Sequence, residues 1–225
     1  GFNAGPEFHA SILVCELAIH TMSSAECALP IGRPRISRSY LTDAWFDALD
    51  EEGRAACAAA KWWRAMRADS AWKVHYEMKH RYTYPRHFVM GRASPFYIEA
   101  LASTVENRLA WVAYFGPYTT NSRTDLIGDT VQGGAISSIF DLMCAITAQR
   151  AAKMKIPTGT LTVRMRQPVP PLRALLVEAW LDDMGGRKVR VKARLTDPSA
   201  ANPTALLAEA EAVHVVPRGR GEVAM

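Results

Sequence analysis

The sequence predicts an α+β fold, in which a curved antiparallel sheet wraps around one long central helix and a helical N-terminal extension comes first. Two observations support this prediction. The second half of the chain reads in the order strand, strand, helix and then four strands. The helix in this order, residues 133–154, is apolar on nearly every side, so it needs a surface that encloses it. A curved antiparallel sheet supplies such a surface.

The N-terminal extension is expected to cover residues 1–85. Within it, residues 1–40 end in a stretch with two prolines and three arginines that is typical of an extended linker. Residues 42–70 are rich in Ala, Leu, Arg and Met and predict a helix, which Gly53 is expected to divide in two. This helix carries large apolar side chains at Trp45, Phe46, Leu49, Trp62, Trp63 and Met66. We expect such a helix to dock on the core domain or on a partner rather than to bind a cofactor.

Two β-rich runs, residues 96–105 and 108–116, predict the first pair of strands. Glu106 and Asn107 lie between them and predict a hairpin connection. The residues that follow, 116–132, are rich in turn formers and predict a loop that leads to the helix.

Four further strands are expected after the helix, at residues 159–169, 174–184, 187–197 and 205–216. A tight turn at residues 183–186 is expected to join the second of these strands to the third. In the third strand, apolar residues alternate with arginine and lysine, which is typical of a strand with one buried and one basic exposed face. These elements define a core domain at residues 86–217 and a C-terminal tail at residues 218–225.

The composition excludes several classes of protein. The chain is 49% hydrophobic and 22% charged, which is ordinary for a globular protein. No apolar run approaches the roughly 20 residues that a membrane helix needs, and Asp141 interrupts the longest one. The formal net charge of +5 favours phosphate-bearing ligands, nucleic acid or an anionic membrane surface. However, no compact cluster of Lys and Arg with interleaved aromatic residues indicates a nucleic-acid partner.

Neither a metal nor another cofactor is predicted. The four cysteines form no CxxC pair, and the six histidines show no HExxH spacing. We expect the cysteines to be free thiols in a reducing compartment, with a disulfide between Cys15 and Cys27 as the alternative.

Asp141 and the Gly133-Gly134 pair are the residues in the predicted helix that point to chemistry. Unpaired N–H groups and a partial positive charge at a helix start make Gly133-Gly134 a candidate site for polarising a carbonyl. Asp141 lies in a run that is otherwise apolar or small. Because a buried isolated carboxylate is costly, Asp141 must reach a cavity, a partner or a subunit boundary. It either bonds a nearby backbone group or Arg, or faces a cleft as a general base or nucleophile.

Several ordered motifs resemble the hotdog-fold acyl-CoA thioesterases, most of all the PaaI-like branch and its mitochondrial thioesterase superfamily member relatives. The motifs are FGPYTT, VQGGAISSIFDLMCA, PTGTLTVRMRQPVP, MGGRKVRVKARLTD and LLAEAEAVHV, which together fall within residues 96–216. The resemblance implies the hotdog fold, with a site at a dimer interface and no cofactor.

The resemblance also implies roles for individual residues. Asp141 corresponds to the family's helix Asp, which acts as base or nucleophile towards the thioester. Gly133 or Gly134 corresponds to the backbone N–H that polarises the carbonyl. A Thr or Ser at the start of the next strand, supplied by the other subunit, corresponds to Thr158, with Thr160 as the second choice.

Gln132 departs from the family pattern, which has His at this position. Gln can hold the turn or touch the substrate, but it does not titrate. Four basic residues are candidates for contacts with the phosphates of CoA, namely Arg164, Arg166, Arg187 and Lys188.

The resemblance implies an enzyme that hydrolyses a fatty or aryl acyl-CoA to the free acid and CoA, as a homodimer or higher oligomer. The alternative is a catalytically inactive hotdog subunit with a structural or accessory role in a larger mitochondrial complex, whose neighbours the N-terminal extension would bind. A third reading is an acyl-CoA or acyl-carrier binder without turnover. The chain starts at Gly1 and not at Met, which fits a removed presequence. The mitochondrial relatives named by the resemblance imply the mitochondrial matrix, and otherwise we expect the cytoplasm.

Overall fold

The computed structural model describes residues 43–76, 89, 94–120 and 130–218. The predicted linker and the rest of residues 1–40 lie outside this part. Helices α1 (Asp43–Ala59) and α2 (Lys61–Ala68) come first, and α3 (Gly133–Ala152) follows later in the chain. The strands are β1 (Trp72–Tyr76), β2 (Phe96–Ser103), β3 (Arg108–Phe115), β4 (Thr158–Met165), β5 (Ala174–Gly185), β6 (Lys188–Thr196) and β7 (Leu206–Val215).

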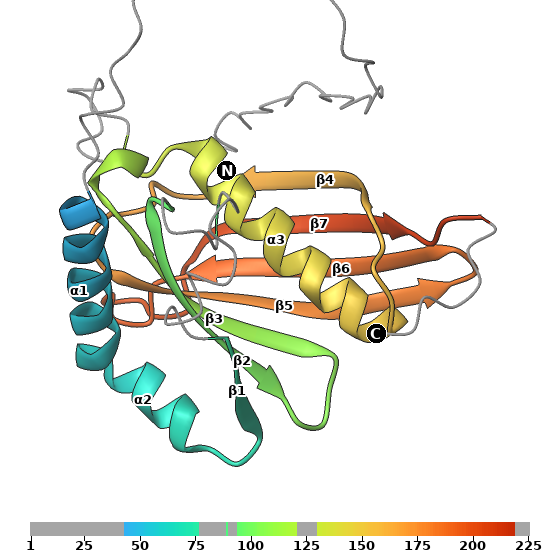
Figure 1. Cartoon of the computed structure of the whole chain (residues 1–225), viewed down its shortest axis with the longest axis horizontal. Helices are drawn as coiled ribbons and strands as arrows, with labels where there is room; N and C mark the ends of the chain where they lie inside the picture. Colours follow the sequence, from blue (N-terminus) through green and yellow to red (C-terminus); the bar gives the residue numbers. More distant parts are fainter. Residues whose placement is uncertain (1–42, 77–88, 90–93, 121–129, 219–225) are drawn as a thin grey trace, which may run out of the picture. The chain divides into compact units, whose positions relative to one another are not determined.

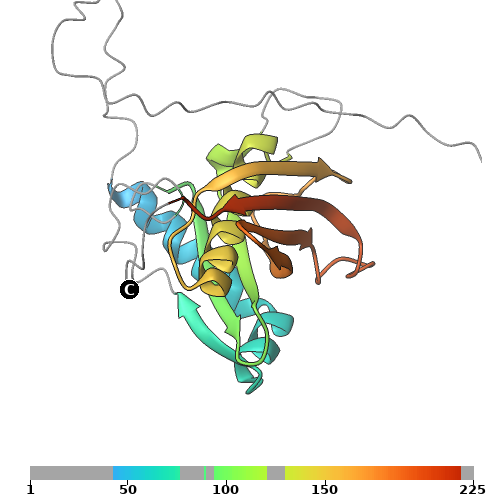
Figure 2. The same ribbon diagram turned by 90° about the vertical axis from the view of Figure 1, so that its right-hand side faces the viewer.

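The described strands form one antiparallel sheet in the order β1-β2-β3-β5-β6-β7-β4. Helix α3 lies along one face of this sheet, and the strands curve around it (Figures 1 and 2). Its core-facing residues are Ile136, Ile139, Phe140, Met143, Cys144, Thr147 and Ala148. The predicted α+β architecture, with one apolar helix inside a curved antiparallel sheet, is confirmed. This is the arrangement that the resemblance implied, the hotdog fold.

Both predicted hairpins are present, with one shift in position. Strands β2 and β3 pair directly, and Glu106 and Asn107 lie in the connection between them. Strand β5 runs to Gly185, one residue further than the expected strand at residues 174–184, and Gly185 pairs with Lys188. The turn is therefore Gly186-Arg187 rather than residues 183–186. Gly186 has a φ of 57°, a conformation that glycine adopts without steric cost.

The prediction that Gly53 divides the N-terminal helix is wrong. Helix α1 continues through Gly53 to Ala59, and the break before α2 falls at Ala60. A Cβ atom on Gly53 would lie 2.3 Å from the Cβ atom of Tyr97 in β2. Glycine at this position therefore allows α1 to pack closely against the sheet, and it does not end the helix.

Strand β1 was not predicted from the sequence. It pairs antiparallel with β2, with Trp72 opposite Ser103 and Val74 opposite Leu101. The described end of the N-terminal extension is therefore part of the sheet.

A buried carboxylate, Glu99 of β2, joins the N-terminal helices to the sheet. Its oxygens accept hydrogen bonds from Trp63 Nε1 at 2.8 Å, Arg67 at 3.0 Å and the Tyr97 hydroxyl at 2.7 Å. Trp63 is itself buried in the core. A carboxylate removed from water needs such partners to keep its charge. The expectation that this aromatic-rich segment docks on the core or on a partner is confirmed for the core.

In the described ranges, no helix combines the length and apolar character that crossing a lipid bilayer requires. Nor does the described part of the chain bring together three or more His, Cys, Asp or Glu side chains in a group that could hold a metal ion.

Candidate active site

Asp141 lies on the one face of α3 that the sheet leaves exposed. The residues around it in sequence, Phe140 and Met143, point into the core. The Thr158 hydroxyl, at the start of β4, donates a hydrogen bond to Asp141 Oδ1 at 3.0 Å. The carboxylate therefore keeps its contact with solvent and gains one fixed partner. This explains how a charge fits in the middle of an otherwise buried helix.

A β-bulge at Gly159 places Thr158 on the helix side of β4. Thr158 of β4 pairs with His214 of β7, and Thr160 pairs with Val213. The chain thus advances two residues along β4 for one residue along β7, which makes Gly159 the extra residue of the bulge. Without the extra residue, Thr158 would share the face of Thr160, because side chains alternate along a strand. With it, Thr158 shares the face of Leu161, which packs against the core.

Of the two threonines, Thr158 is the one that the structure brings to Asp141. Thr160 is exposed, on the other face of the strand. The contact is made within one chain, whereas the resemblance placed the threonine in the other subunit. Thr158 and Asp141 are thus positioned by the fold of a single chain.

The start of α3 offers two N–H groups for which the described residues hold no acceptor. The N–H groups of Ala135 and Ile136 both donate to the Gln132 carbonyl, whereas those of Gly133 and Gly134 have no such partner. A Cβ atom on Gly134 would meet nothing within 4 Å, so the backbone there is open to an approaching group. The hydroxyls of Ser137 and Ser138 bond the carbonyls of Gly133 and Gly134 and do not enter this space.

Gln132 holds the turn that precedes the helix. Its backbone N–H donates to the Thr119 carbonyl at 2.7 Å, and its side-chain Nε2 donates to the Thr120 carbonyl at 3.2 Å. Gln132 was expected either to hold the turn or to touch the substrate, and the structure shows that it holds the turn.

Asp141 and the helix start do not meet within one chain. Eight residues separate Gly133 from Asp141, and a rise of 1.5 Å per residue puts them about 12 Å apart along the helix axis. One carbonyl group needs its polarising donor and its attacking group within about 3 Å. The two halves of the predicted machinery are therefore separate in the single chain.

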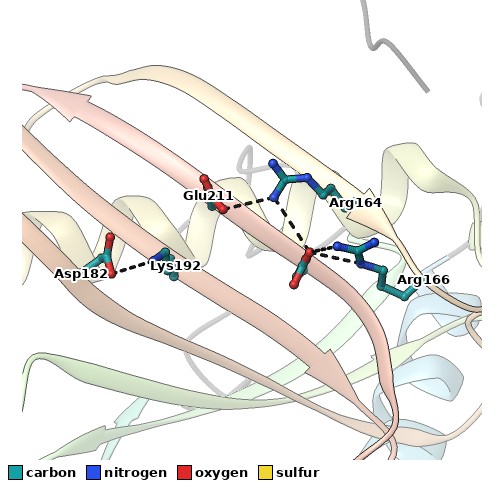
Figure 3. Close-up of polar contacts among 6 residues, drawn as sticks. Arg164, Arg166, Asp182, Lys192 and Glu211 are labelled. Carbon is teal, nitrogen blue, oxygen red and sulfur yellow. Dashed lines mark hydrogen bonds and ion pairs between the residues drawn. The ribbon is translucent and has the colours of Figure 1, made fainter. Parts of the chain in front are cut away.

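The basic candidates do not converge on Asp141. Arg164 donates to Glu211 at 3.1 Å, and Arg166 pairs with Glu209, with Nε at 3.1 Å (Figure 3). Arg164 lies on the face of β4 opposite Val163, which packs against the core, so this cluster occupies the outer face of the sheet. Figure 3 also shows the pair of Lys192 and Asp182 on that face.

Arg187 and Lys188 lie at the other end of the sheet from Arg164. Arg187 Nε donates to the Val216 carbonyl at 2.8 Å, and Lys188 is exposed. Lys188 pairs with Val215, the neighbour of His214, so these two cations lie towards the Thr158 end of β4.

His214 is a residue near Asp141 that sequence reasoning missed. It is fully buried, and neither ring nitrogen makes a hydrogen bond of good geometry to the described residues, although the Pro157 carbonyl lies close enough to act on the ring. Burial lowers the pKa of His214, while the Asp141 carboxylate and the Pro157 carbonyl act in the opposite direction. The signal was in the alternation of β7, since His214 continues the series of buried small residues Ala208, Ala210 and Ala212.

Cys144, one helical turn after Asp141, does not supply a nucleophile. Burial, and after it the negative charge of Asp141, raises the pKa of Cys144 to about 12. The group therefore remains a neutral thiol, which is a poor nucleophile.

Comparisons with known proteins find matches among solved structures alone. Neither the family models nor the curated proteins give a match. Several of the structural neighbours are described as thioesterases or thioesterase superfamily proteins. One is a thioesterase superfamily protein from Shewanella loihica, 22% identical, with 49% of this chain and 85% of that chain covered at a TM-score of 0.39.

Two further structural neighbours match a similar share of this chain. A phenylacetic acid degradation-related protein from Ralstonia eutropha is 21% identical over 49% of this chain and 77% of its own, with a TM-score of 0.39. A variant of acyl-CoA hydrolase from Staphylococcus aureus is 20% identical over 49% of this chain and 67% of its own, with a TM-score of 0.44. At such scores, the fold assignment depends on the strand order and the enclosed helix described above, and not on these likenesses.

Proposed function

We propose that the chain hydrolyses an acyl-CoA thioester, with a fatty or aryl acyl group, to the free acid and CoA. The observation that supports this proposal is the exposed mid-helix carboxylate of Asp141, held by the Thr158 hydroxyl. A carboxylate that is fixed on one oxygen and open to solvent on its other side is suited to act on water or on a carbonyl carbon.

In the proposed reaction, Asp141 takes a proton from a water molecule as the water oxygen attacks the thioester carbonyl carbon. The tetrahedral intermediate then collapses, the C–S bond breaks, and CoA leaves as a thiolate that receives the proton. Thr158 donates to Oδ1 and so leaves Oδ2 as the base. Direct attack by Asp141, through an anhydride that water later cleaves, uses the same geometry.

The carbonyl oxygen needs donors that one chain cannot place near Asp141, because about 12 Å separates the two along α3. We assign this role to the Gly133 and Gly134 N–H groups of a second copy. A pair of chains related by a two-fold axis would bring each helix start to the other chain's Asp141 and so form two equivalent sites. In this arrangement the proposed enzyme acts as a homodimer or a higher oligomer.

The phosphates of CoA are assigned to Arg187 and Lys188 rather than to Arg164 and Arg166. The latter two already pair with Glu209 and Glu211, which reduces the positive charge available to a phosphate. Lys188 is exposed near the Thr158 end of the sheet.

Release of free CoA thiol from a panel of fatty and aryl acyl-CoAs tests the proposal, with wild type beside Asp141→Asn. The substitution preserves the shape of the side chain and removes the base, so we expect turnover to fall about 10²- to 10⁴-fold. Asp182→Asn, on the outer face of the sheet, is the matched control and should keep full activity.

Two results would contradict the proposal. Full activity in Asp141→Asn would remove Asp141 from the reaction. A folded wild-type protein that turns over none of the substrates would favour the alternative of a non-catalytic subunit.

A further inference from the structure

We propose that His214 is a positioning residue for Asp141, whose protonation draws the Asp141 carboxylate away from Thr158 and so switches off the base. This inference builds on the function proposed above and adds a regulator of the same site. Its starting point is an imidazole that is fully buried, whose ring nitrogens make no hydrogen bond of good geometry in the described structure and have the Pro157 carbonyl as their near polar neighbour.

The strand register brings His214 beside the Asp141–Thr158 pair. Thr158 of β4, His214 of β7 and Val189 of β6 form one cross-strand row. His214 lies on the α3-facing side of β7, with the buried Ala212, and Thr158 lies on the α3-facing side of β4 because it reaches Asp141. Asp141 of α3 therefore lies over this cross-strand row. Thr158 is the present hydrogen-bond partner of Asp141, and His214 is the residue beside Thr158 in the row.

His214 faces one charged group among the described residues that pack against it. From α3 this group is Asp141, and the Cys144 thiol near Asp141 remains neutral. The core-facing residues of β4 after Thr158 are Leu161 and Val163, and those of β6 are Val189, Val191, Ala193 and Leu195, none of which titrates. The charge state of His214 is thus linked mainly to that of Asp141.

The two protonation states of His214 have opposite effects on Asp141. When the imidazole is neutral, it leaves the Asp141 carboxylate charged and bonded to Thr158. When it is an imidazolium, it attracts the Asp141 carboxylate away from the Thr158 hydroxyl, because opposite charges stabilise each other. Burial disfavours the imidazolium near neutral pH, so the base is free there and is lost on the acid side.

A titration of the His214 ring by NMR tests the coupling without a substitution at His214. Wild type, Asp141→Asn and Asp182→Asn are compared. The apparent pKa of His214 should lie below 6.5 in wild type. It should fall further in Asp141→Asn, which lacks the charge that favours the imidazolium, and it should be unchanged in Asp182→Asn. An equal pKa of His214 in wild type and Asp141→Asn would overturn the inference.

The pH dependence of kcat separates a positioning role from a purely structural one. His214→Gln keeps polar character and does not titrate, so the acid limb of its profile should move to lower pH while KM stays the same. A variant that loses thermal stability but keeps the wild-type acid limb would contradict the role. Because the NMR titration needs no turnover, failure of the thioesterase proposal and failure of this coupling give different results.

Discussion

Asp141 illustrates how one residue can differ from its neighbours in sequence and still fit the helix. Its near neighbours Phe140 and Met143 are buried in the core, whereas Asp141 lies on the exposed face and bonds Thr158. The residue type in that apolar run was enough to predict a special role. The sequence also required Asp141 to reach a cavity, a partner or a subunit boundary, but it did not identify a hydrogen bond from Thr158 of the same chain, because that bond depends on the register of β4.

The Thr158–Asp141 bond is expected to contribute to catalysis. A hydrogen bond to a charged group contributes about 1.5–3 kcal/mol, so Thr158→Val should lower kcat roughly 10- to 100-fold. Thr160→Val, on the opposite face of β4, is the matched control and should change kcat little. Steady-state kinetics on the best acyl-CoA provide the measurement. Equal losses in the two variants would argue that β4 as a whole, and not this bond, matters.

His214 predicts a pH dependence of stability. Since the folded-state pKa lies below the ordinary 6.5, the unfolded chain binds more protons between the two values. The free energy of unfolding should therefore fall as the pH drops below about 6.5, by up to about 1.4 kcal/mol for each pKa unit of the shift. Urea unfolding of wild type and His214→Gln at several pH values measures the free energy of unfolding. In the variant, the decrease of this free energy with falling pH should lack the contribution of His214. Identical slopes would show that His214 keeps its ordinary pKa in the folded protein.

At the scale of elements, Gly53 connects α1 to the sheet by its lack of a side chain. A Cβ atom there would overlap Tyr97 at 2.3 Å, so Gly53→Ala should reduce the free energy of unfolding by about 1–3 kcal/mol. Gly134→Ala is the control, because its Cβ atom would enter open space. Chemical denaturation of both variants is the measurement. If Gly53→Ala is as stable as wild type, the close packing of α1 on β2 does not occur in solution.

The sequence predicted those elements whose patterns are local. The helix at residues 133–154 and the β2–β3 hairpin follow from hydrophobic runs and turn residues, and both are present. The five residues of β1 form too short a run to stand out, and this strand is defined by its pairing with β2. Gly53 was misread for the same reason, since its role depends on Tyr97, which is distant in sequence.

At the scale of the whole molecule, the described chain holds the two parts of the proposed site at separate places. Strand β4 ends the sheet with β7 as its single neighbour in the described structure, and Met165 on it is 41% exposed beside the start of α3. Asp141 and Gly134 lie on the same helix at a separation that one substrate carbonyl cannot bridge. The resemblance implied Asp141, the two glycines and Thr158, and the fold joins two of these. It could not imply His214, which depends on the register of β7 against β4.

The measurement that tests the central claim most directly uses mixed oligomers of two inactive variants. Asp141→Asn lacks the base, and Gly134→Val is designed to cover the open N–H group at the helix start, where a Cβ atom would meet nothing within 4 Å in the chain itself. Each variant alone should be inactive while folded. A mixed dimer, isolated through two different affinity tags, contains one site with both parts intact and should recover about half of the wild-type turnover. A mixed dimer as inactive as its parents would contradict a site that is shared between two chains.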